Sequence, residues 1–103
     1  MLLLGCKPPG RYTEQHDIFF GIGSTLRDLL PDMFAFWPEA NGKIHIDSWR
    51  EVTQVAGYTV KVIPRTELSA DMQGMAKLFF INLGGYKEND REEYHYKMLI
   101  ACQ

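Results

Sequence analysis

Several features that mark whole classes of protein are missing from this sequence. Its longest apolar runs are only a few residues long, far short of the roughly 20 residues that span a bilayer, so we expect no membrane segment. Its 11 basic and 13 acidic residues are interspersed, and no basic stripe marks a surface for nucleic acid. We therefore expect neither a membrane nor a nucleic acid as a partner.

Cysteines and reactive motifs are also scarce. The cysteines are Cys6 and Cys102, near opposite ends of a sequence without a recognisable export signal, which is typical of reduced thiols in the cytoplasm. A bridge between them is the alternative if the two terminal strands are neighbours. No serine or cysteine lies in a nucleophile motif, and we expect no cofactor and no bound metal.

The most informative feature that is present is an internal repeat. A shift of 79 residues without a gap aligns Leu4 with Leu83, Gly5 with Gly84, Glu14 with Glu93 and His16 with His95. An apolar run follows the histidine in both segments, as in a strand that enters a sheet. The repeat therefore predicts a duplicated structural unit.

Copy one, residues 1–64, has the pattern of two strands, a helix and two more strands. The strands are expected at residues 1–4, 16–22, 43–47 and 58–63. The second of them is apolar on both faces in its later part, which favours a central position in the sheet. Apolar residues at helical spacing predict a covering helix over Thr25–Trp37. Thr25 and Asp28 match a capping box, and Pro31 should kink this helix or begin its second part.

The rest of the chain has the pattern of a connector and an incomplete second copy. Residues 65–76 show no period, and residues 77–103 repeat only the first two strands. We expect a single domain of the α+β class, an antiparallel or mixed β-sheet with one covering helix, built from a duplicated β-β-(α-β-β) unit whose second copy is truncated. Apolar surface left uncovered on Lys77–Leu83 and Glu93–Ala101 predicts a homodimer, either simple or swapped.

The repeat carries the first candidate site, the Glu-x-His pairs Glu14 with His16 and Glu93 with His95. On a strand, residues i and i+2 project from the same face, so each carboxylate can orient its imidazole for acid–base catalysis or for binding a ligand or a metal. A purely structural role, in which each histidine bonds the backbone of its own loop, is the competing interpretation.

His45 and Asp47 form the second candidate site. Their spacing is that of two members of the two-histidine, one-carboxylate site of non-haem iron proteins. A third ligand would have to come from His16 or His95, the remaining histidines of the chain. A solvated strand face gives the same pattern and is the alternative.

The third candidate is the predicted strand-to-helix junction at Gly21, Gly23, Ser24 and Thr25. Free backbone N–H groups at the start of a helix bind anions, and glycines allow a close approach. The lysine of a P-loop is missing. The junction therefore predicts either a small anionic ligand or glycines that only form the turn.

Three stretches together resemble an uncharacterised bacterial family, the domain of unknown function (DUF) 1543. They are Leu83-Gly84-Gly85-Tyr86, Glu14-Gln15-His16-Asp17 and His45-Ile46-Asp47-Ser48-Trp49-Arg50-Glu51. The resemblance covers almost the whole chain and implies the duplicated unit, but it implies no activity, cofactor or catalytic residue. Cys6 departs from the repeat, because the second copy has Gly85 in its place.

For function, the sequence predicts a small cytoplasmic binding or protein-interaction module that acts as a homodimer and has no enzymatic activity. The alternative is a small enzyme, hydrolytic or acid–base, that uses the paired Glu-x-His sites on an anionic small molecule. The arrangement of the histidines in space separates these two hypotheses.

Overall fold

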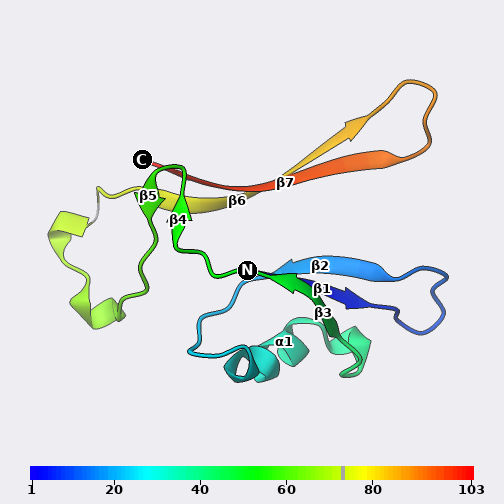
Figure 1. Cartoon of the computed structure of the whole chain (residues 1–103), viewed down its shortest axis with the longest axis horizontal. Helices are drawn as coiled ribbons and strands as arrows, with labels where there is room; N and C mark the ends of the chain where they lie inside the picture. The colour runs from blue at the N-terminus through cyan, green and yellow to red at the C-terminus, as the bar shows by residue number, and fades with distance from the viewer. Residues whose placement is uncertain (73) are drawn as a thin grey trace. The chain divides into compact units, whose positions relative to one another are not determined.

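The computed structural model describes residues 1–72 and 74–103 (Figure 1). The chain divides into two units, Met1–Val52 and Thr53–Gln103, which we name unit 1 and unit 2. Over the described residues the fold is α+β, with one α-helix and three antiparallel sheets. None of the helices in this part of the chain is long and apolar enough to cross a membrane.

Unit 1 is built on a three-stranded sheet in which β1 (Leu2–Cys6) lies between β2 (Gln15–Phe19) and β3 (His45–Trp49). Both pairings are antiparallel. The apolar run of β1 suits a central strand, which is covered more completely than its neighbours. The prediction that residues 16–22 form a central strand is therefore wrong. β2 lies at an edge and ends at Phe19, where the chain leaves the sheet toward the helical segment.

The helical segment of unit 1 is shorter than predicted. In place of one helix over Thr25–Trp37 there is a 3-10 turn, η1 (Arg27–Leu29), then α1 (Leu30–Phe36) and a second 3-10 turn, η2 (Pro38–Ala40). Pro31 lies in the first turn of α1, where its missing N–H removes no helical hydrogen bond. Of the two predicted outcomes, a kink or the start of a second part of the helix, the second is observed. The predicted capping pair also forms, since Thr25 N–H donates to Asp28 Oδ2 (3.1 Å) and Asp28 N–H donates to Thr25 Oγ1 (3.3 Å).

The core of unit 1 lies between α1 and one face of the sheet (Figure 1). Leu4 and Met33 are almost completely buried, with 0% and 1% of their surface exposed. Cys6 is buried too, and both cysteines are free thiols. The core cluster consists of Leu2, Leu4, Phe19, Leu29 and Met33, with Leu26, Leu30, Trp37, Ile44 and Ile46 packed against it. The predicted inward direction of the two isoleucines is confirmed, although β3 begins two residues later than the strand predicted over 43–47.

A β-bulge interrupts the pairing of β1 with β3. Leu4 pairs with Ile46 but Leu3 pairs with Ser48, so Asp47 is the extra residue on the bulged strand. A bulge twists the strand locally and changes the direction of a side chain. This irregularity places Asp47 next to the histidines described below.

Unit 2 contains two hairpins, of which the shorter joins β4 (Gln54–Val55) to β5 (Tyr58–Thr59). The turn residues Ala56 and Gly57 both have positive φ, 51° and 83°, as the favoured two-residue hairpin turn requires. The strand predicted over residues 58–63 is therefore too long. β5 ends at Thr59, and one further backbone hydrogen bond, from Val60 N–H to the Thr53 carbonyl (2.8 Å), follows the assigned pairs.

The longer hairpin pairs β6 (Lys77–Tyr86) with β7 (Glu93–Cys102). Its strands contain the segments predicted over 77–83 and 93–101. The connector before it holds two 3-10 turns, η3 (Arg65–Glu67) and η4 (Ala70–Met72). Gln73, which belongs to the predicted connector, lies outside the described residues.

The prediction of a single sheet is wrong, because the described strands form three separate sheets. In unit 1 both edges of β1 are occupied by β2 and β3, and each hairpin of unit 2 pairs within itself. All the pairings are antiparallel, so the sheets are not mixed.

Candidate functional site

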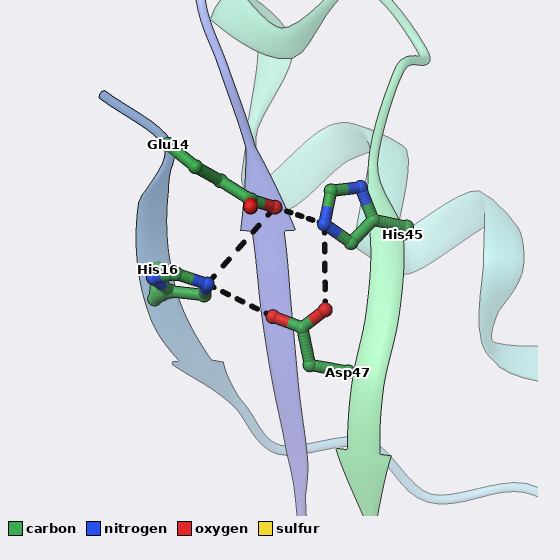
Figure 2. A network of polar contacts seen from close by, with 4 residues as sticks. All are labelled: Glu14, His16, His45 and Asp47. Atoms are coloured by element: carbon green, nitrogen blue, oxygen red, sulfur yellow. Dashed lines mark ion pairs between the residues drawn. The ribbon is translucent and has the colours of Figure 1, made fainter. Parts of the chain in front are cut away.

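Four polar side chains of unit 1 meet on the face of the sheet opposite α1. Gly5 of β1 pairs with His16 on one side and with His45 on the other. Directly paired residues of neighbouring strands point to the same face, so the two imidazoles flank a position that has no side chain. Figure 2 shows them pointing toward each other across β1.

A carboxylate accompanies each histidine. Glu14 precedes β2 and is two residues from His16, and Asp47 is two residues from His45 at the bulge of β3. Figure 2 shows both carboxylates turned toward the centre of the group. We name Glu14, His16, His45 and Asp47 the His/carboxylate cluster.

The distances join the four side chains into a closed ring. His16 Nε2 lies 3.0 Å from Asp47 Oδ2 and 4.0 Å from Glu14 Oε1. His45 Nε2 lies 3.3 Å from Asp47 Oδ1 and also contacts Glu14 Oε1. Each carboxylate therefore contacts both imidazoles. Asp47 is the least exposed of the four side chains at 32% and His45 the most exposed at 53%, so the cluster is open to solvent.

Gly5 forms the floor of the His/carboxylate cluster. A Cβ atom added at Gly5 would lie 2.5 Å from both Glu14 Oε1 and His45 Nε2, and 2.9 Å from Asp47 Oδ2. Real Cβ contacts are not this short. Glu14, His45 and Asp47 can therefore converge here only because residue 5 is glycine.

The two carboxylates of the cluster repel each other unless a positive charge balances them. Two ionised carboxylates bring a charge of −2 when both imidazoles are neutral, and like charges this close repel each other. Either a divalent cation or protons on the imidazoles can balance them. The arrangement is therefore suited to metal binding or to acid–base chemistry. The two motifs that the sequence predicted separately, Glu14 with His16 and His45 with Asp47, form one cluster.

Unit 2 carries a smaller version of this arrangement. His95 Nε2 lies 3.6 Å from Glu93 Oε2, and His95 Nδ1 lies 3.2 Å from Asn82 Oδ1. Gly84 pairs with His95. β6 has no third strand beside it among the described residues, so the Glu93 and His95 pair lacks the second histidine and carboxylate that β3 supplies in unit 1.

The junction at Gly21, Gly23, Ser24 and Thr25 has no part in the His/carboxylate cluster. The Thr25 N–H group donates to the Asp28 carboxylate of the same chain, and Leu29 Cδ2 occupies the space where a Cβ of Gly21 or Gly23 would lie. An internal carboxylate thus already uses one of the donors expected to bind an anion. The anion site at this junction stays a prediction.

Sequence reasoning singled out all four cluster residues but assigned them to two motifs. It missed Gly5 as the floor of the site and the bulge that positions Asp47. The alignment of Gly5 with Gly84 was an available signal, because both glycines lie opposite the histidine of a Glu-x-His pair.

Comparison with known proteins gives one match. A family model described as Domain of Unknown Function (DUF1543) matches residues 11–62, which is half of the chain and includes the whole His/carboxylate cluster. No curated protein and no solved structure matches the chain.

Proposed function

The chain belongs to the DUF1543 family, which assigns it no activity, and from the geometry of unit 1 we propose that it is a binding module for one divalent transition-metal ion. Glu14, His16, His45 and Asp47 are the proposed ligands. The observation that carries this proposal is the convergence of donor atoms of Glu14, His45 and Asp47 above Gly5. His16 Nε2 lies beside this group, 3.0 Å from Asp47 Oδ2.

The spacing of the donor atoms fits a metal ion. The ligand atoms of Glu14, His45 and Asp47 all lie within 4.8 Å of one another. Ligand bonds of about 2.1 Å in tetrahedral geometry place two donors roughly 3.4 Å apart. The distances of 3.0, 3.3 and 4.0 Å within the cluster lie on both sides of this value. Small movements of exposed side chains therefore suffice for binding.

The types of donor atom narrow the choice of ion. Imidazole nitrogen suits zinc, iron, copper and nickel, whereas calcium and magnesium prefer oxygen ligands alone. Two carboxylates with two neutral imidazoles also balance the charge of a divalent ion. Zinc(II) is the ion we select for the test, because it binds such nitrogen and oxygen donors in tetrahedral geometry and has no redox chemistry.

The test is isothermal titration calorimetry of chelator-treated protein with zinc sulfate. We expect one zinc ion per chain in the wild type and in the matched control His95→Ala, whose histidine belongs to unit 2 and not to the His/carboxylate cluster. His45→Ala should weaken binding at least about 100-fold, since even outer partners of metal ligands contribute 10- to 100-fold. Circular dichroism checks that both variants fold. Absence of saturable binding, or an equal loss in both variants, would overturn the proposal.

A second candidate function is an enzyme of the hydrolytic or acid–base type acting on an anionic small molecule. The 3.0 Å contact between His16 Nε2 and Asp47 Oδ2 supports it, because a carboxylate at this distance orients an imidazole for proton transfer. Turnover of an activated carboxylic ester that disappears in His16→Ala would support this function. No turnover above that of the His16→Ala variant would exclude ester hydrolysis.

We further infer that the hairpins β1–β2 and β6–β7 are copies of one unit. Each of the five pairs between β1 and β2, from Leu2 with Phe19 to Cys6 with Gln15, has its counterpart 79 residues later between β6 and β7. An identical register supports duplication more strongly than the four identical residues alone. The unit 2 pair Glu93 and His95 is then a counterpart of half the metal site.

A homodimer in which a second copy covers β6 and β7 is the corresponding proposal for assembly. Its support is the exposure of apolar side chains on this hairpin, including Leu78, Leu83 and Tyr96, which are 44%, 53% and 64% exposed. Light scattering at micromolar concentration should give twice the mass of the chain, and a monomer would contradict the dimer. The cytoplasmic location and the bacterial origin stay predictions from the sequence.

A further inference from the structure

A shallow pocket lies on unit 1 beside the His/carboxylate cluster. Its volume is about 240 Å³, and its lining residues are Met1, Leu3, Ile18, Ser48, Trp49 and Arg50. This volume is below the roughly 300–1,000 Å³ of pockets for drug-sized ligands, so it suits a ligand of only a few carbon atoms. The pocket is therefore of the size of a small metabolite.

The strand pairing places this pocket next to the cluster. Leu3 pairs with Ile18 and with Ser48, one step of two residues along β1 from Gly5 and its histidines. Two residues of a strand span about 6.6 Å, and residues i and i+2 share a face. Ser48 also follows Asp47 directly at the bulge. The pocket and the cluster are thus neighbours on the same face of the sheet.

The lining of the pocket combines apolar and cationic groups. Leu3 and Ile18 offer aliphatic surface, and Ser48 offers a hydroxyl group. Among the described residues no carboxylate lies within ion-pair distance of Arg50, so its guanidinium has no anionic partner in this part of the chain. The Met1 amine donates to the Arg50 carbonyl (3.1 Å), and burial and the Arg50 charge hold the pKa of this amine below its ordinary value of 8.0. Arg50 therefore gives the lining of the pocket a positive charge.

We propose that this pocket binds a short aliphatic carboxylate, with its carboxylate group on Arg50 and Ser48 and its carbon chain on Leu3 and Ile18. Guanidinium and hydroxyl groups are the donors that carboxylates take in proteins. The carbon chain then extends along the face toward the His/carboxylate cluster. This inference deepens the proposed function by naming the class of ligand that would reach the metal ion, but binding at Arg50 does not itself require the metal.

The probe is butanoate, added to uniformly ¹⁵N-labelled full-length protein and followed by the amide shifts of Leu3, Ile18 and Ser48. We expect saturable shifts with a dissociation constant on the order of 1 mM, because the ligand has one charged group and few carbon atoms. Arg50→Gln should weaken this binding at least about tenfold, since it removes a charge-assisted bidentate contact. Arg65→Gln, in unit 2, is the matched control and should bind as the wild type does.

The same titration is made with zinc-loaded and with chelator-treated protein, so that this inference and the proposed function fail separately. Butanoate shifts that persist without zinc support the pocket even if calorimetry finds no zinc site. No saturable shifts in either form, equal shifts with butylammonium, or unchanged binding in Arg50→Gln would overturn the carboxylate pocket while leaving the zinc result standing.

Discussion

Replacing Gly5 with alanine is expected to abolish zinc binding without unfolding the chain. The added Cβ would lie 2.5 Å from Glu14 Oε1 and from His45 Nε2, whereas ordinary contacts begin at 3.4 Å. These two donors must therefore retreat by about 0.9 Å, the difference between the two distances. A bound zinc ion needs its donors at about 2.0–2.2 Å. The added methyl group would occupy the space above residue 5 where Glu14 and His45 approach each other, so we expect these donors not to reach one ion.

The same substitution should have little effect on the free energy of unfolding. The displaced atoms are the ends of exposed side chains that can rotate away, and Gly5 is not among the glycines with positive φ. Alanine in a strand is favoured over glycine by roughly 0.5–1 kcal/mol. Urea denaturation of the zinc-free variant should therefore show a stability equal to that of the wild type or higher by up to about that amount.

Gly84→Ala is the matched control. It changes the equivalent glycine of unit 2, where the added Cβ would lie 2.6 Å from Glu93 Oε1 and meet no second donor at such a distance. Calorimetry with zinc sulfate should give wild-type binding for Gly84→Ala and none for Gly5→Ala. The reasoning is refuted if Gly5→Ala binds zinc with the wild-type affinity, because the donors would then not meet above residue 5.

Three further predictions concern the fold. Leu4→Ala should lower the free energy of unfolding by about 2–5 kcal/mol, because Leu4 is fully buried between the sheet and α1; a loss well below this range in urea denaturation would contradict that packing. Thr25→Ala should lower the free energy of unfolding by roughly 0.5–1 kcal/mol, because it removes the hydroxyl that accepts the Asp28 N–H. The control Ser24→Ala should leave this free energy unchanged. Tyr94→Phe should raise the pKa of Asp90, because the Tyr94 hydroxyl donates to Asp90 Oδ2 (2.6 Å) and is the main cause that holds this pKa below 3.8. The stabilisation from this contact is present above pH 3.8 and is lost as the pH falls through the lowered pKa. A ¹³C NMR titration of Asp90 should show the higher pKa in Tyr94→Phe and no change in the control Tyr96→Phe. An unchanged Asp90 pKa in Tyr94→Phe would contradict the contact.

Local signals predicted the presence of the elements better than their lengths. The Thr25 and Asp28 pair correctly indicated where the helical segment begins, and Pro31 where its second part, α1, begins, because capping and the missing proline N–H act within one turn. The lengths of β2, of α1 and of β5 depend on partners elsewhere in the chain. β5 pairs with β4 over two residues, and no local pattern in residues 58–63 contains the extent of this pairing.

The four cluster residues were predicted, but their meeting was not. Glu14 and His16 are far in sequence from His45 and Asp47, and only the strand order β2-β1-β3 brings them to the two sides of Gly5. The bulge at Asp47 is also invisible in the alternating pattern of residues 43–47, since an extra residue in one strand is defined by its partner strand. The chemistry of the cluster was therefore readable in single residues, whereas the site depended on long-range pairing.

The measurement that tests the central claim most directly is a zinc-edge anomalous difference map from crystals of the zinc-loaded protein. The metal-binding proposal predicts one strong peak per chain above Gly5, about 2.0–2.2 Å from donor atoms of Glu14, His16, His45 and Asp47. A map without a peak there, or with its strongest peak at Glu93 and His95 or at Cys102, would contradict the claim that the His/carboxylate cluster of unit 1 is a metal site.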